Sequence, residues 1–217
     1  MNYRSQSSFP PVVLNLIIVN VLAFMATHMT DKTNFIFGNF ALFPAESPFF
    51  ELWQPFTYMF LHGDITHLFF NMFSLWMFGR TLEYELGWKR FLIFYLVCGI
   101  GAALVQLGIA EIDLNHIGEN MGERIAYLCT PTIGASGSVF GLLLAFGMLH
   151  PNATIMLLIP PIPMKAKWFV IIYGLIELYL GVRGGGGIAH FAHLGGMFWG
   201  WLLLLWWARR DRNRYIY

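Results

Sequence analysis

The sequence has few charged residues. Only 12% of its 217 residues are Asp, Glu, Lys or Arg, whereas 57% are hydrophobic. Soluble domains carry about 25% charged residues, and a chain of this length has no way to hide so much apolar surface from water. The composition therefore excludes an ordinary soluble domain. It predicts one compact membrane domain that crosses the bilayer several times.

Net charge and cysteine are scarce as well. The formal net charge is +1, which argues against a nucleic-acid partner, because nucleic-acid-binding domains carry a strong excess of Lys and Arg. The two cysteines, Cys98 and Cys129, form no recognisable metal or disulfide pattern. We interpret both as ordinary apolar residues and expect no metal and no other cofactor.

Apolar runs recur along the chain and predict six membrane-spanning helices. The first run follows Pro10-Pro11, which suits a helix start, and it has no small-residue cleavage site behind it. We therefore expect this helix to be retained rather than removed as a signal peptide. The predicted spans are 11–28, about 65–79, 88 to about 109, 136–149, 168–181 and about 188–208.

The connections between these runs differ in character. We expect residues 30–60 to form an aromatic-rich stretch in the membrane interface and residues 80–90 to form a charged turn. We expect a polar acidic loop at 111–124, a proline-containing connection at 151–167 and a glycine-rich hinge at 183–187.

Six spans place both ends of the chain on one side of the membrane. That side receives ten basic residues: Arg4, Arg80, Lys89, Arg90, Lys165, Lys167, Arg209, Arg210, Arg212 and Arg214. The opposite side receives three: Lys32, Arg124 and Arg183. The positive-inside rule then predicts cytoplasmic termini. The expected organisation is a short cytoplasmic N-terminus (1–10), a six-helix membrane domain (11–208) and a basic cytoplasmic tail (209–217).

The fourth run is too short to cross a bilayer. Its 14 residues, 136–149, make a helix of about 21 Å at about 1.5 Å per residue, whereas the hydrocarbon core is about 30 Å thick. The apolar stretch 125–133 before it contains Pro131, which predicts a re-entrant segment that starts the helix below the membrane surface. Irregular backbone at that depth needs protein or a water-filled cavity around it, so we expect Ser136 to face a cavity.

Small residues at helical spacing predict that the fourth and sixth runs pack closely. They are Gly137, Gly141 and Ala145 on the fourth run, and Gly196 and Gly200 on the sixth. His193 shares the face of the sixth-run glycines, and close packing is what a hydrogen bond between Ser136 and His193 requires. The alternative is that these glycines serve packing alone.

Ser136 also begins a helix. Free N–H groups and the positive dipole end at that position favour an anion, such as the tetrahedral oxyanion formed when a peptide carbonyl is attacked. The alternative is an ordinary N-cap serine. Ser138 lies one residue off the glycine-flanked position, so we assign it a structural role.

A second polar group lies on the second run. His67 and Asn71 are four residues apart and share a helix face, so both can donate hydrogen bonds into a polar cavity. His62 lies about a turn earlier, at a less regular place. The alternative is that these are buried polar residues with satisfied hydrogen bonds, and for His62 we favour that alternative.

In their order and spacing these motifs resemble the bacterial type of rhomboid intramembrane serine proteases. The motifs are His62-x4-His67-x3-Asn71, Gly79-x3-Glu83, Gly134-Ala135-Ser136-Gly137 and Ala192-His193-x2-Gly196. Each motif alone is weak, but the ordered set is specific and covers all six spans. The resemblance implies an all-α six-helix bundle and a serine endopeptidase that cleaves transmembrane helices of other membrane proteins.

The resemblance also implies roles for individual residues. Ser136 is the expected nucleophile and His193 the expected base, with the oxyanion bound by the Ser136 N–H, Asn71 and His67. The cavity is expected to be supported by His62, Phe140, Gly134 and Gly137, and the packing by Gly141, Gly196, Gly200 and Glu83. The expected partners are transmembrane substrates and membrane lipids, and the expected location is the bacterial inner membrane. The sequence indicates neither the substrate nor the oligomeric state.

The chain departs from the usual pattern of that family at three positions. Gln54 follows Trp53 where Arg is common, which removes the partner usually proposed for Glu83. Phe140 stands where Tyr is common, and it keeps an aromatic ring under the imidazole without a hydroxyl. Ile188 stands where Gly is usual.

No Asp or Glu in the sequence is placed to orient the imidazole of His193. The expectation is therefore a dyad of serine and histidine rather than a triad.

Other classes of function fit the sequence less well. A metalloprotease would use His190 and His193, but the chain has no His-Glu-x-x-His and we expect no carboxylate near them. An aspartyl protease would need a second intramembrane Asp beside Asp64. A transporter is disfavoured because the spans do not form two matching halves and intramembrane charge is almost absent apart from Glu177. The non-enzyme alternative is an inactive relative that binds membrane helices, against which the intact Ser136 and His193 argue.

Overall fold

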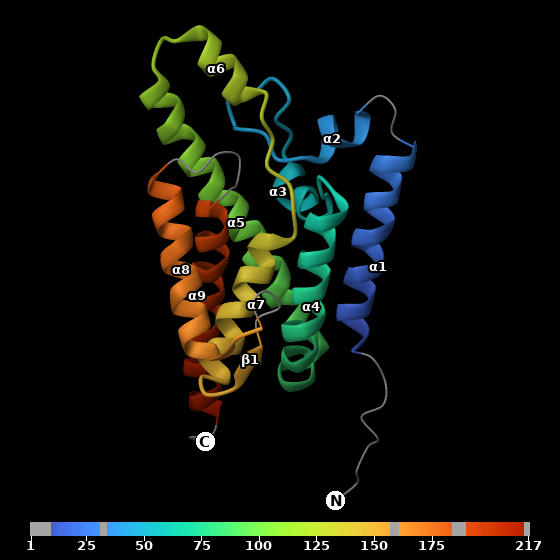
Figure 1. Cartoon of the computed structure of the whole chain (residues 1–217), viewed down its shortest axis with the longest axis vertical. Helices are drawn as coiled ribbons and strands as arrows, with labels where there is room; N and C mark the ends of the chain where they lie inside the picture. Colours follow the sequence, from blue (N-terminus) through green and yellow to red (C-terminus); the bar gives the residue numbers. More distant parts are fainter. Residues whose placement is uncertain (1–9, 31–33, 157–160, 184–189, 215–217) are drawn as a thin grey trace, which may run out of the picture.

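The long helices of the protein run side by side along its longest axis (Figure 1). The computed structural model describes residues 10–30, 34–156, 161–183 and 190–214. Its six long helices are α1 (Pro11–Met25), α4 (Ile65–Leu86), α5 (Trp88–Ile117), α7 (Ser136–Leu149), α8 (Ala166–Val182) and α9 (His190–Arg214). The predicted all-α fold is therefore confirmed.

Three stretches are long and apolar enough to cross a membrane by length and composition: Pro11–Met29, Trp88–Ile117 and His190–Asp211. The helix Ser136–Leu149 is apolar but shorter, with the bounds that the sequence predicts. The count of six spans stays a prediction.

Three helices continue past the predicted ends of their spans. α4 runs to Leu86, α5 to Ile117 and α9 to Arg214, so most of the expected turn 80–90 and the first part of the expected loop 111–124 are helical. Polar residues lower hydropathy without breaking a helix. The chain instead turns at Gly87 and Gly118, which have φ of +77° and +61°, a region that favours glycine.

The remaining connections also contain regular structure. A π-helix (Ala26–Thr30) extends α1, and the aromatic-rich stretch 30–60 holds α2 (Phe35–Phe40), α3 (Gln54–Thr57) and a 3-10 helix (Tyr58–Phe60). The proline-containing connection holds β1 (Thr154–Met156) paired antiparallel with β2 (Pro163–Lys165), and Ile155 lies opposite Met164. The expected hinge 183–187 lies outside the described residues except for Arg183, and Ile188 also lies outside them.

The short helix α7 lies inside the bundle, packed by α4, α5, α8 and α9. Above it, α6 (Met121–Leu128) lies at the upper end of the molecule, and the chain then descends in extended form to reach α7 (Figure 1). Residues 125–128 of the expected re-entrant segment are therefore part of α6, and only the residues after it lead down to Ser136.

Glycine lets α5, α7 and α9 approach one another around Cys98. This cysteine is fully buried, and a Cβ on Gly141 would overlap its side chain. A Cβ on Gly200 would lie 3.1 Å from Cys98 Sγ. Within the described residues both cysteines are free, and Cys129 is exposed. Cys98 therefore acts as a small packing residue.

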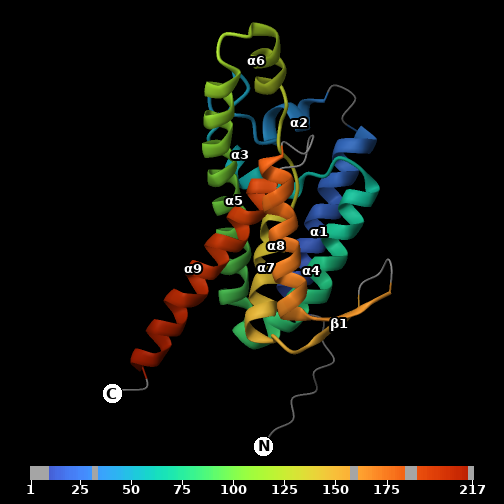
Figure 2. The same cartoon turned by 60° about the vertical axis from the view of Figure 1, so that its left-hand side comes forward.

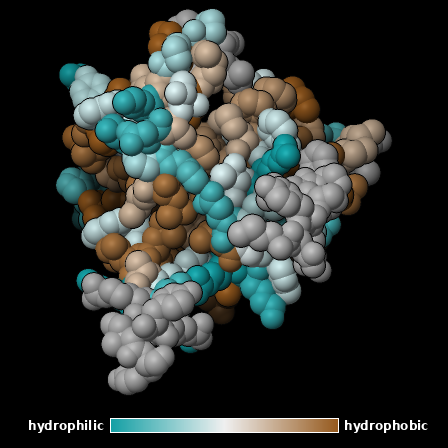
Figure 3. All heavy atoms as spheres, turned by 90° about the horizontal axis from the view of Figure 1, so that it is seen from below, coloured by the Kyte–Doolittle hydropathy of each residue, from teal (hydrophilic) through white to brown (hydrophobic). Residues whose placement is uncertain are grey.

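The start of α1 and the end of α9 lie at the same end of the molecule (Figure 1). Seen from that end, hydrophilic side chains run across the face between hydrophobic ones (Figure 3). α9 leans away from the other helices as it approaches this end (Figure 2). There Arg90 of α5 forms an ion pair with Asp211 of α9 at 2.8 Å, which ties the leaning helix to the start of α5.

The side chains of Gln54 and Glu83 hydrogen-bond to the backbone of two segments, and the sequence did not predict either contact. Gln54, fully buried, accepts the N–H of Phe43 at 3.2 Å and donates to the carbonyl of Phe49 at 2.7 Å. Glu83 accepts the N–H groups of Val12 and Val13 at 2.9 and 2.8 Å. Glutamine thus holds the first loop in place of arginine, and Glu83 binds the first turn of α1. Glu83 therefore has a partner in α1, although the arginine usually proposed for it is absent.

Replacing Glu83 with alanine is expected to destabilise the protein by about 1.5–3 kcal/mol, because two N–H groups at a helix start lose a charged acceptor. For a chain of this size that corresponds to a fall of roughly 3–12 °C in the melting temperature, measured by differential scanning fluorimetry in detergent. Glu85→Ala is the control, since Glu85 is exposed and pairs with His150 at the surface. Equal melting temperatures for the two variants would contradict the assignment.

Candidate functional site

The backbone before α7 places Ser136 at the start of that helix. Thr132 pairs with Leu42 in an isolated antiparallel bridge, and the N–H of Gly134 donates to the carbonyl of Tyr58 at 3.0 Å. Gly134 has φ of +125°, and a Cβ there would lie 2.8 Å from Nε2 of His67. Both the conformation and the space require glycine at this position.

Ser136 and His193 meet between α7 and α9. The distance from Ser136 Oγ to His193 Nε2 is 2.8 Å. The helices approach this closely because Gly137 faces Gly196, and a Cβ on Gly196 would overlap the carbonyl oxygen of Gly137. The predicted small-residue spacing thus brings a hydroxyl and an imidazole within hydrogen-bond distance.

Phe140 fixes the plane of the imidazole. Its ring stacks on that of His193 with 4.2 Å between centroids and 6° between planes. Phe140 lies four residues after Ser136, one turn along α7, so the same helix presents the hydroxyl and the stacking ring. The aromatic ring lies against the histidine, and no phenol hydroxyl takes part.

The other nitrogen of His193 contacts a carboxylate. His193 Nδ1 lies 2.9 Å from Oε2 of Glu177 on α8, and His190 Nδ1 lies 2.7 Å from the same oxygen. The expectations that no carboxylate is placed to orient the imidazole and that none lies near the two histidines are therefore wrong. Glu177 is the sole acidic residue of the predicted fifth span. An ionisable residue in such a span is a functional candidate with a partner to be found, and that signal could have identified it.

Glu177, His190 and His193 are also the residues that could hold a metal ion among those described. Their ligand atoms all lie within 4.8 Å of one another. The oxygen–nitrogen distances of 2.7 and 2.9 Å are those of hydrogen bonds.

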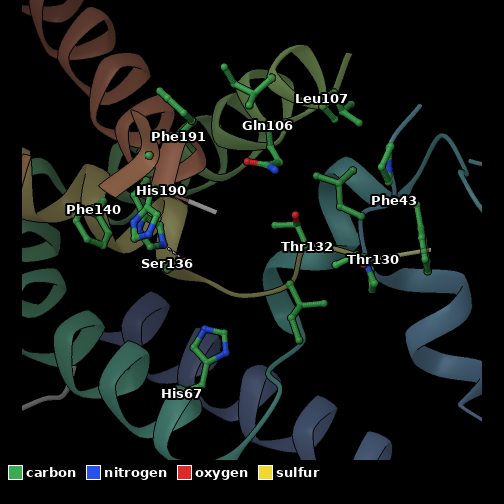
Figure 4. A pocket seen from close by; sticks show the side chains of 18 of the residues that line it. Phe43, His67, Gln106, Leu107, Thr130, Thr132, Ser136, Phe140, His190 and Phe191 are labelled. Atoms are coloured by element: carbon green, nitrogen blue, oxygen red, sulfur yellow. Dashed lines mark hydrogen bonds between the residues drawn. The ribbon is translucent and has the colours of Figure 1, made fainter. Parts of the chain in front are cut away.

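His67 lies on α4, across the cavity from Ser136 (Figure 4). Asn71, four residues later on α4, also lines the cavity. One N–H of the Asn71 amide donates to the carbonyl of His67 at 3.1 Å, which leaves its second N–H for another acceptor. Asp64 accepts the N–H of His67 at 2.8 Å and caps α4. That carboxylate has a structural task at the start of a helix.

His62 lies behind His67 rather than in the cavity wall. It is fully buried, and its ring meets that of His67 edge-on at 4.9 Å between centroids. Burial, with a smaller contribution from His67, lowers the pKa of His62 to about 3. A neutral ring therefore packs against that of His67. The expectation that His62 has satisfied hydrogen bonds is wrong, because neither of its ring nitrogens has a hydrogen-bond partner among the described residues.

One cavity, with a volume of about 1010 Å³, is lined by residues of both α4 and α7. Its wall includes Ser136, His193, His67 and Asn71. Gln106, Thr130 and Thr132 add polar side chains farther from Ser136, and Phe43 and Leu107 add apolar ones (Figure 4). A cavity with both kinds of lining can hold a peptide backbone and its apolar side chains together.

Ser138, two residues after Ser136, points elsewhere. It is fully buried, and its hydroxyl donates to the carbonyl of Tyr95 at 2.7 Å. The structural role assigned to it agrees with this contact, since the bond ties α7 to α5.

Comparison with known proteins gives a consistent relationship. The family model described as "Rhomboid domain" matches residues 50–210. The chain is 32% identical over 149 residues to "Rhomboid protein 1, mitochondrial" of Saccharomyces cerevisiae, covering 66% of this chain and 40% of that protein. It is 28% identical over 207 residues to "RHOMBOID-like protein 12, mitochondrial" of Arabidopsis thaliana, covering 94% and 60%. It is 32% identical over 93 residues to "Rhomboid protease GluP" of Bacillus subtilis, covering 43% and 15%. The chain thus spans less than two thirds of the length of these relatives.

Proposed function

The chain belongs to the rhomboid family, and from this premise we propose that it is an intramembrane serine endopeptidase that cleaves transmembrane helices of other membrane proteins. The observation that carries the proposal is the 2.8 Å hydrogen bond between Ser136 Oγ and His193 Nε2 in the wall of the cavity. A hydroxyl held against an imidazole is the arrangement that activates serine for attack on a carbonyl carbon.

The proposed reaction begins when His193 Nε2 accepts the proton of Ser136 as Oγ attacks the scissile carbonyl. The resulting oxyanion is bound by the Ser136 N–H, the second N–H of Asn71 and the imidazole of His67. In soluble proteases such a donor contributes about 2.7–4 kcal/mol. The N–H of Ser136 is free for this task, because the first N–H groups of a helix have no intrahelical partner. His193 then protonates the leaving amine, and water hydrolyses the acyl group.

The proposed location is the bacterial inner membrane, with both termini in the cytoplasm and membrane lipids around the bundle. The distribution of basic residues supports this orientation, with ten on the terminal side and three on the other. α1 begins and α9 ends at the same end of the molecule (Figure 1), as that distribution requires. The cavity then opens away from the cytoplasm.

Labelling with a fluorophosphonate is the experiment that tests the proposal. The purified protein in detergent is expected to form one covalent adduct, on Ser136 by peptide mass spectrometry, and chelation by EDTA is expected to leave labelling unchanged. His193→Ala should abolish labelling, because the hydroxyl loses its base.

Ser138→Ala is the matched control for labelling. It should retain the adduct while the melting temperature falls, since one buried hydrogen bond is worth about 0.5–1.5 kcal/mol. A folded protein that forms no adduct would instead be the inactive relative that binds membrane helices. An adduct that survives Ser136→Ala would overturn the assignment of the nucleophile.

A further inference from the structure

We propose that Glu177 is a positioning residue for the base, so that Ser136, His193 and Glu177 form a three-residue relay in place of a dyad. His190 holds the carboxylate from a second direction. The inference rests on the proposed function, since it concerns how His193 works as a base. It rests structurally on the contacts among α7, α8 and α9.

The carboxylate selects the tautomer of His193. An ionised carboxylate only accepts hydrogen bonds, so Nδ1 of His193, 2.9 Å from Oε2 of Glu177, is the protonated nitrogen. A neutral imidazole carries one proton. Nε2 therefore presents its lone pair to Ser136 Oγ at 2.8 Å. A general base needs this form, and in the opposite tautomer Nε2 could not accept the serine proton.

The carboxylate also stabilises the charge that the reaction creates. When His193 takes the proton of Ser136 it becomes an imidazolium, and the anion at 2.9 Å lies on its far side. The side chains of Glu177 and His193 are only 10% and 12% exposed. Water therefore screens their attraction weakly.

His190 keeps the carboxylate in place. Its Nδ1 lies 2.7 Å from the same oxygen that His193 contacts, and its ring meets that of His193 at 89°. A buried carboxylate needs donors to offset its lost hydration, and two imidazole N–H groups provide them. The two histidines are three residues apart on one face of α9, so a single helix sets both donors.

The distances favour this relay over a metal site. Two ligands of one tetrahedral zinc, each about 2.0–2.2 Å from the metal, lie roughly 3.3–3.6 Å apart. The carboxylate oxygen lies 2.7 and 2.9 Å from the two nitrogens, which is the spacing for a shared proton rather than a shared metal.

Glu177→Gln is the decisive variant, because the amide keeps the shape of the side chain, removes the charge and can donate to Nδ1, which favours the wrong tautomer. With a fluorogenic transmembrane substrate in liposomes, kcat is expected to fall about 10²–10⁴-fold, while KM stays within about threefold. The rate of fluorophosphonate labelling should fall in parallel. His190→Leu should lower kcat less, by about 10-fold, as a supporting partner of the orienting group.

Glu85→Gln is the matched control. Glu85 and His150 form the same carboxylate–imidazole contact at 2.9 Å, at the surface and outside the cavity wall, so kcat should not change. If Glu177→Gln turns over at the wild-type kcat, with or without a lower melting temperature, Glu177 is structural and the inference is overturned.

Three outcomes separate this inference from other failures. Cleavage that persists in Ser136→Ala would overturn the proposed function and the relay together, whereas loss in Ser136→Ala with full activity in Glu177→Gln overturns the relay alone. Activity that EDTA removes and Zn²⁺ restores would mean that the cluster binds a metal, and this too would overturn the relay.

Discussion

Alanine at Ser136 is expected to lower kcat for a transmembrane substrate by about 10⁴-fold or more, to the background rate. Removal of the hydroxyl leaves no nucleophile at the 2.8 Å contact with His193, and residues of a serine protease that act as one unit lose nearly everything when either is removed. His193→Ala should therefore lose about as much. The measurement is single-turnover cleavage in liposomes of defined lipid composition.

The double variant makes this prediction sharper. Because Ser136 and His193 act together, the double alanine variant is expected to be no slower than either single variant. Losses that multiply would mean that the two side chains contribute independently, which would contradict a shared proton transfer. Ser138→Ala controls for the loss of a hydroxyl from the same turn of α7.

Gly196→Ala is expected to lower kcat about 100-fold without touching any reacting group. A Cβ at this position would overlap the carbonyl oxygen of Gly137 and lie 2.7 Å from its carbonyl carbon. Backbone atoms cannot rotate away, so α7 and α9 must separate. A displacement of roughly 1 Å between nucleophile and base is enough for a loss of that size. The overpacking should also cost about 1–3 kcal/mol.

Gly108→Ala and Gly174→Ala are the controls for Gly196→Ala. A Cβ on Gly108 meets nothing within 4 Å, and one on Gly174 meets only the end of the Met197 side chain at 3.7 Å. Both changes should leave kcat unchanged and hold or raise the melting temperature, because alanine favours helix over glycine. Equal activity in Gly196→Ala and these controls would contradict the role of the close helix contact.

The sequence predicted the features that depend on local spacing. The small residues that face α9 and the meeting of Ser136 with His193 follow from residues three, four or seven apart, a regularity that a helix imposes. The ends of α4 and α5 did not follow, because hydropathy marks where a helix leaves the apolar zone. A helix itself ends where the backbone turns, here at Gly87 and Gly118.

The position of Glu177 could not be read from the sequence for a different reason. Most of α8 is apolar, so its pattern does not reveal which face turns toward α9. Glu177 and His193 lie 16 residues apart on successive helices, and their contact depends on how α8 is rotated about its axis. Gln54 was missed likewise, since its backbone partners come from an irregular loop.

The contact between Glu83 and α1 has a consequence for where the folding unit begins. The family match starts at residue 50, yet the Glu83 carboxylate inside that match is only 4% exposed and accepts the N–H groups of Val12 and Val13. A fragment that begins at residue 50 would lack both N–H donors, so this carboxylate would have lost both hydrogen bonds inside an apolar bundle. The segment that the family model matches is thus smaller than the packed unit, which reaches back to Pro11.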